Sequence, residues 1–171
     1  MQHVKGVLIA LGIAAVVVFL LSLLIPQQMV LIQETIVNEP QDSVYSFIKE
    51  KENLQTWVTD LNGLRLEEKH TANKNYEELT FTGHDKSHYR LEFYNSVRAK
   101  GLEIRYFKED EKKAVFIITT KSQGAQTIVS LQQFWNLGIN PFSKLIAFKS
   151  KKKSQEVLER DLTKLKKRVE N

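Results

Sequence analysis

The chain contains 171 residues, of which 42% are hydrophobic and 26% are charged, and it contains no cysteine. Its formal net charge is +5, but residues 141–171 alone carry ten Lys and Arg residues against four Asp and Glu residues, so the basic character belongs to the C-terminal end. About 145 residues remain once an apolar N-terminal segment is set aside, which allows one domain with a core and excludes two.

Residues 7–25 form an uncharged run of 19 residues in which Ser22 is the one conventional polar side chain. As a helix, this run reaches roughly 28 Å, close to the hydrocarbon thickness of a bilayer. The alternative is a cleaved signal peptide, whose apolar region is usually about 7–15 residues long and ends in a small-x-small site. The sequence LSLLIPQQ offers no such site. We therefore expect residues 1–28 to be a retained, single-pass transmembrane anchor in the cell membrane.

The orientation of this anchor follows from the basic residues around it. Lys5 lies on its N-terminal side, whereas the first basic residue beyond it is Lys49. The positive-inside rule then places the N-terminus in the cytoplasm and the rest of the chain outside it. The absence of cysteine fits either compartment.

The segment after the anchor predicts one strand and two short helices. Residues 29–37 are rich in β-branched and aliphatic side chains, which favours a strand. Pro40 then opens a helix, because apolar side chains recur at three- and four-residue spacing in residues 44–48. Asn53 is expected to cap a second short helix that carries Trp57.

Apolar and polar residues then alternate for some seventy positions, and short polar breaks interrupt them. This pattern is typical of an antiparallel meander in which one face of the sheet is buried and the other is wet. The expected strands are 64–69, 76–82, 89–97, 102–107, 114–121 and 126–135.

Pro141 begins a final long helix. Its apolar residues recur at three- and four-residue steps and predict a buried stripe, formed by Leu145, Phe148, Leu158, Leu162, Leu165 and Val169. The same helix carries the run KSKKK, with Lys149, Lys151, Lys152 and Lys153. No aromatic residues interleave this run, so we expect no nucleic-acid partner. It is either a solvated face or a contact for anionic lipid headgroups.

Three segments carry a resemblance to a known family: IVNEPQDSVYSFIKEKENLQTW, LQQFWNLGINPFSKLIAF and VLERDLTKLKKRVEN. With the order of elements, they resemble the START-like helix-grip superfamily (SRPBCC), in particular its polyketide-cyclase/lipid-transport branch. For residues 29–171, the resemblance implies an α+β domain whose curved antiparallel sheet wraps around the long C-terminal helix. It also implies an apolar cavity between the sheet and this helix, and a single N-terminal anchor is familiar in bacterial members.

Such a cavity would bind a hydrophobic or lipid-like small molecule without a cofactor. Strand alternation and the tryptophan helix predict the residues that would contact this molecule: Trp57, Leu79, Phe81, Leu91, Phe93, Ile104, Tyr106, Ile117 and Leu131. In the alternative interpretation, the same side chains simply fill a core, and the domain is a ligand-free module that binds a partner protein.

Sequence motifs for catalysis are missing. The chain contains no nucleophile elbow, phosphate-binding loop or Cys/His cluster. His84 and His88 fall at an expected turn between strands, where a spacing of four residues does not bring side chains together, so we expect surface residues and no metal. An enzyme of the cyclase or hydrolase kind is the alternative function, in which Tyr94, Tyr106, Gln132 or Gln133 would assist proton transfer.

Overall fold

The structure is a computed structural model that describes residues 2–61, 64–73, 76–83, 85–95 and 100–171. A helix, a strand, two short helices, six more strands and a long helix follow one another, which confirms the predicted order. The elements are α1 (Gln2–Leu23), β1 (Gln28–Val37), α2 (Gln41–Lys49), α3 (Leu54–Trp57), β2 (Arg65–Asn73), β3 (Tyr76–Thr82), β4 (His88–Asn95), β5 (Gly101–Lys108), β6 (Glu111–Gln123), β7 (Gln126–Asn136) and α4 (Pro141–Val169). Single 3₁₀ turns, Lys51–Asn53 and Thr59–Leu61, flank α3.

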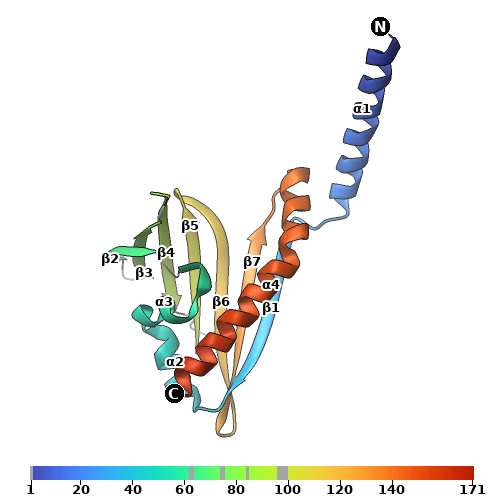
Figure 1. The fold of residues 1–171 in the computed structure, drawn as a ribbon. Coiled ribbons are helices and arrows are strands. Elements are labelled where there is room, and N and C mark those ends of the chain that lie inside the picture. The colour runs from blue at the N-terminus through green and yellow to red at the C-terminus, as the bar shows by residue number, and fades with distance from the viewer. Residues whose placement is uncertain (1, 62–63, 74–75, 84, 96–99) are drawn as a thin grey trace.

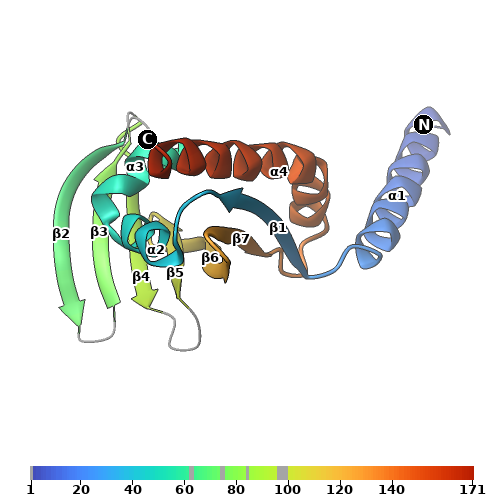
Figure 2. The ribbon, with the colours of Figure 1, turned by 90° about the horizontal axis from the view of Figure 1, so that it is seen from below.

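The strands form one antiparallel sheet in the order β1-β7-β6-β5-β4-β3-β2. Strand β1 extends the meander of β2 to β7 at its β7 edge. It pairs with β7 over its whole length, from Gln28 opposite Asn136 to Val37 opposite Thr127. The sheet curves around α4, and α2 and α3 lie on the same side of the sheet as α4 (Figures 1 and 2). This arrangement confirms the helix-grip α+β architecture.

Helix α4 starts where the sequence predicts. The side-chain oxygen of Asn140 accepts hydrogen bonds from the backbone N–H groups of Phe142 and Ser143, at 2.9 and 3.4 Å, and Pro141 occupies the first turn. The second half of the predicted stripe is correct, since Leu158, Leu162 and Leu165 are buried in the core.

The predicted stripe is wrong at the start of α4. Phe148 is exposed, and Leu145 is only half-buried. The first turns of α4 extend past the end of the sheet towards α1 (Figure 1), and Phe148 is 62% exposed. Helical spacing alone does not reveal where the surface that would cover it ends.

One detail of the short helices also differs from the predictions. Val44 and Ile48 of α2 are buried as expected, but Asn53 does not cap α3 through its side chain. Its amide instead donates hydrogen bonds to the carbonyl of Phe47, at 3.1 Å, and to the carboxylate of Glu50, at 3.0 Å. Asn53 therefore connects α3 to α2.

Helix α1 projects away from the domain, and its C-terminal end contacts α4 (Figures 1 and 2). Among the described residues, Gly6–Leu23 is the one helical segment whose length and composition suit a membrane span, with a mean hydropathy of 2.9 and 6% of the segment buried. Near its end, the carbonyl of Ser22 accepts a hydrogen bond from Nζ of Lys144 in α4, at 3.2 Å. Both residues are buried at this contact.

Candidate functional site

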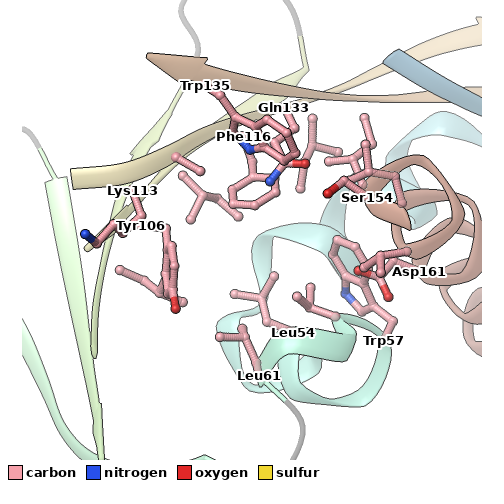
Figure 3. A pocket seen from close by; sticks show the side chains of 18 of the residues that line it. Leu54, Trp57, Leu61, Tyr106, Lys113, Phe116, Gln133, Trp135, Ser154 and Asp161 are labelled. Atoms are coloured by element: carbon pink, nitrogen blue, oxygen red, sulfur yellow. The ribbon is translucent and has the colours of Figure 1, made fainter. Parts of the chain in front are cut away.

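A cavity of about 330 Å³ lies between the concave face of the sheet, the α3 region and α4 (Figure 3). Its size falls within the usual range of small-molecule sites, about 300–1,000 Å³. Most of its lining is aliphatic or aromatic. The residues are Leu54, Trp57, Val58 and Leu61 near α3; Leu91, Ile104, Tyr106, Lys113, Ala114, Phe116, Ile118, Leu131, Gln133 and Trp135 on the sheet; and Lys153, Ser154, Val157, Leu158 and Asp161 on α4.

The sheet wall of the cavity is set by strand register. Residues directly opposite each other on paired strands point to the same face. Ile104 of β5 lies opposite Phe116 of β6, which in turn lies opposite Gln133 of β7. Two residues further along β5, on the same face, Tyr106 lies opposite Ala114 of β6. These pairs form a continuous wall that crosses three strands.

The opposite wall is formed by the α3 region, which a hydrogen-bonded cluster holds against α4. The carboxylate of Asp161 accepts hydrogen bonds from the backbone N–H of Thr59, at 3.0 Å, and from the Thr59 hydroxyl. Nζ of Lys164 also donates to this hydroxyl, at 3.1 Å. Asp161 is 4% exposed, so its charge is stabilised inside the protein by these donors. Trp57 and Asp161 lie side by side at this wall (Figure 3).

The cavity contains a few polar groups that could orient a bound molecule. The Trp57 side chain is 1% exposed, and its Nε1 has no hydrogen-bond partner in the part of the chain that the structure describes. Because a buried N–H without a partner is costly, this group is a donor available to an acceptor on a ligand. Lys113 of β6 and Lys153 of α4 are exposed members of the lining and place positive charge beside the cavity. Lys113 also forms an ion pair with Glu111, at 2.5 Å.

The structure brings five of the nine predicted contact residues together around the cavity: Trp57, Leu91, Ile104, Tyr106 and Leu131. Leu79, Phe81 and Phe93 are buried in the same core but lie outside the lining. They belong to β3 and to the part of β4 beyond Leu91, which pack away from the space beneath α4.

The prediction that Ile117 contacts a ligand is wrong, because its side chain lies on the face of the sheet opposite the cavity. Ile117 pairs with Glu103 on β5 and with Gln132 on β7, both of which alternate away from the cavity. Its neighbours Phe116 and Ile118 line the cavity instead. All four residues from Val115 to Ile118 are apolar, so alternation of polarity could not assign the inward face of this strand.

The residues named for an alternative enzymatic role also divide between the two faces. Tyr106 and Gln133 line the cavity, whereas Tyr94 and Gln132 point away from it. The Tyr94 hydroxyl donates a hydrogen bond to Glu92, at 2.9 Å, and its ring lies 4.1 Å from the guanidinium of Arg105. Burial raises the pKa of Tyr94, and the hydrogen bond to Glu92 raises it further. Tyr94 is therefore part of an ionic ladder on the outer face.

Sequence reasoning missed the α4 contribution to the cavity, which is Lys153, Ser154, Val157, Leu158 and Asp161. These residues follow the same three- and four-residue spacing as the predicted stripe. That spacing could have identified them, but three of the five are polar. Among the described residues there is no cluster of three potential metal ligands. His88 is exposed at the start of β4, and His84 lies outside the described residues.

Comparisons with known proteins show the fold. No family model matches the chain, and no curated protein matches its sequence. Solved structures do match. A protein from Thermus thermophilus is 18% identical, with a TM-score of 0.60, over 82% of this chain and 97% of its own. The Zhui aromatase/cyclase from Streptomyces sp. R1128 is 10% identical, with a TM-score of 0.60, over 84% of this chain and 94% of its own.

A third similar structure is norcoclaurine synthase from Thalictrum flavum in complex with dopamine and hydroxybenzaldehyde. It is 12% identical, with a TM-score of 0.59, over 83% of this chain and 86% of its own. The similarity shows that these proteins and this chain have a common fold, one on which an aromatase/cyclase and a norcoclaurine synthase are built.

Proposed function

We propose that this chain is a membrane-anchored member of the START-like superfamily (SRPBCC), in its polyketide-cyclase/lipid-transport branch, and that it binds a hydrophobic or lipid-like small molecule without transforming it. The observation that carries this proposal is the cavity of about 330 Å³, because its walls are mainly carbon and a space of this kind favours an apolar guest. Residues 1–28 act as the anchor and residues 29–171 as the binding domain.

The polar groups around the cavity narrow the class of ligand. The apolar walls suit an acyl chain or a fused-ring skeleton. The unpaired N–H of Trp57 suits a hydrogen-bond acceptor on the buried part of such a molecule. Lys113 and Lys153, which are exposed residues of the lining, suit an anionic headgroup. A fatty acid, or another amphipathic molecule with a negative charge at one end, meets these requirements.

The proposed membrane location is supported by the length and hydropathy of Gly6–Leu23. In this location the domain draws its ligand from the bilayer or delivers it there. With Lys5 on the N-terminal side, the positive-inside rule favours a domain outside the cytoplasm. Protease added to intact cells should then digest the domain, and alkaline carbonate should leave the chain in the membrane fraction.

A fluorescence titration tests ligand binding directly. The chain has two tryptophans, and both Trp57 and Trp135 line the cavity. We therefore expect a nitroxide-labelled fatty acid to quench their emission saturably in the full chain in detergent micelles. The expected dissociation constant is micromolar, which corresponds to about 8 kcal/mol. Unlabelled fatty acid should restore the emission. Quenching that rises linearly and ignores the unlabelled competitor would show that the probe does not occupy the cavity.

Catalysis is the second candidate function, and one observation favours it. The carboxylate of Asp161 is buried at the cavity wall beside Trp57, a position from which it could act as a general base towards a bound molecule. Two structures with the same fold are named as an aromatase/cyclase and a synthase. Liquid chromatography coupled to mass spectrometry separates the two functions, because a bound molecule is recovered with unchanged retention and mass after incubation with a carrier, and with a change in at least one of them after incubation with an enzyme.

A further inference from the structure

The start of α4 exposes large apolar side chains that the rest of the domain leaves uncovered. Ile139 in the preceding loop is 82% exposed, and Phe142 and Ile146 in the first two turns are 66% and 67% exposed. Phe148 is exposed as well, but it lies four residues from Lys144 and therefore points to a different side of α4 from Phe142 and Ile146. We call residues 139–148 the interfacial segment. Large apolar groups gathered this closely on a surface typically mark a contact with a membrane or another macromolecule.

The side of α4 that carries Phe142 and Ile146 changes from apolar to basic along the helix. At about 100° per residue, Phe142, Ile146, Lys149 and Lys153 lie on nearly the same side of α4. The face is therefore apolar for two turns and basic for the next two. Lys149 lies about 10 Å along the helix axis from Phe142. Amphipathic elements bury their apolar part about 5–10 Å into the headgroup and acyl boundary, where lysines meet anionic headgroups.

The interfacial segment also lies at the end of the candidate membrane span. Lys144 Nζ donates a hydrogen bond to the carbonyl of Ser22, in the last turn of α1, and both side chains are buried in this contact. Phe142 and Ile146 are two residues from Lys144 on either side, so they point to the other side of α4. Helix α1 therefore fixes the position of the segment without covering its apolar face.

We infer that the interfacial segment inserts its apolar side chains into the bilayer surface where α1 leaves the membrane, and that it binds anionic lipid there through the lysines that follow. The inference rests on the membrane span that the proposed function assigns to α1, and it adds the orientation of the domain. Continuity with the span and the adjoining positive charges favour an anionic lipid surface over a protein partner.

This orientation has a consequence for the cavity. Lys153 and Ser154 belong to the cavity lining and come one turn after Lys149 on α4. Trp135 also lines the cavity, and in the sequence it comes four residues before Ile139. The cavity therefore opens next to the headgroup layer, and an amphipathic ligand can pass between bilayer and cavity along the basic face of α4.

The absence of cysteine makes a site-specific test simple. Phe142→Cys and Ile146→Cys are each labelled with the environment-sensitive fluorophore NBD. The full chain is reconstituted in vesicles of phosphatidylcholine and phosphatidylglycerol that carry a nitroxide near the top of the acyl chain. The matched control is Gln123→Cys, an exposed residue at the β6–β7 hairpin, at the other end of the domain (Figure 1).

We expect blue-shifted emission and a loss of at least half of the NBD signal to nitroxide quenching at positions 142 and 146, with neither effect at position 123. The triple variant Lys149→Gln, Lys151→Gln, Lys152→Gln should lower the quenching at position 142. Equal quenching at positions 142 and 123 would overturn the inference. So would a blue shift at position 142 without quenching, because a second copy or a partner protein would then cover the segment.

Carbonate extraction of the same vesicles separates this inference from the proposed function. A chain that stays in the membrane but shows no quenching at position 142 has its anchor and lacks only the interfacial contact. A chain that carbonate removes has no span, and both the anchor and the interfacial contact are then rejected. The nitroxide fatty acid titration of Trp57 and Trp135 reports on the cavity independently of either result.

Discussion

Replacing Leu162 with alanine is expected to lower the free energy of unfolding by about 2–5 kcal/mol. Leu162 is 2% exposed and lies on the face of α4 that packs against the sheet with Leu158 and Leu165. The truncation removes transfer free energy and leaves a void, since neighbouring side chains relax only partly. Chemical denaturation of the full chain in micelles, followed by circular dichroism, measures the loss.

Lys167→Ala is the matched control, because Lys167 is exposed on the same helix. It should change the free energy of unfolding by less than about 0.5 kcal/mol. A Leu162→Ala variant that is as stable as this control would contradict the packing of α4 against the sheet, and with it the helix-grip arrangement.

Ile104→Trp is expected to abolish binding of a fatty acid or an apolar dye while the domain remains folded. Ile104 lines the cavity from β5, and a tryptophan there would occupy space that the ligand needs. Insertion of a larger side chain usually costs about 1–3 kcal/mol in a filled core, but here the added volume can enter the cavity. Retention of a radiolabelled fatty acid, measured beside the circular dichroism spectrum, tests both parts of the expectation.

Ile117→Trp is the control for this variant. It makes the same substitution on the adjacent strand, but Ile117 points to the opposite face of the sheet. We expect Ile117→Trp to retain the fatty acid with the affinity of the unmodified chain. If both variants retain it equally, the molecule binds elsewhere. If Ile104→Trp fails to fold, the space around Ile104 is too small for a guest.

The fold was predictable because the period of the sequence changes twice. Helical spacing ends before β2, two-residue alternation continues to β7, and helical spacing returns after Pro141. Polar breaks between the strands are short, so neighbouring strands in the chain pair with each other. The pairing of β1 with β7 depends on contacts between the two ends of the domain, and local spacing in the sequence does not predict it.

The site was harder to predict than the fold, for two physical reasons. In β6, the residues from Val115 to Ile118 are apolar on both faces, so polarity did not distinguish the face with Phe116 from the face with Ile117. In addition, a cavity wall includes polar residues that sequence patterns assign to the surface. Asp161 is an example, since its burial depends on the donors of Thr59, a residue 102 positions away.

The interfacial segment shows that the exposure of apolar residues is also hard to predict from the sequence. Phe148 fits the apolar stripe of α4 by spacing, and only the structure shows that this side chain is exposed. An apolar residue in an amphipathic helix can face a protein core or a lipid surface, and helical period does not distinguish the two.

The mass of the intact chain, released from mild detergent after purification from its native membrane, tests ligand binding in the cavity most directly. We predict that the unmodified chain and Ile117→Trp each carry one additional small molecule in near-stoichiometric amount, identifiable by fragmentation as apolar or amphipathic, and that Ile104→Trp has the mass of the chain alone. The bare mass in all three proteins, or the same added molecule in all three, would contradict a ligand-binding role for the cavity.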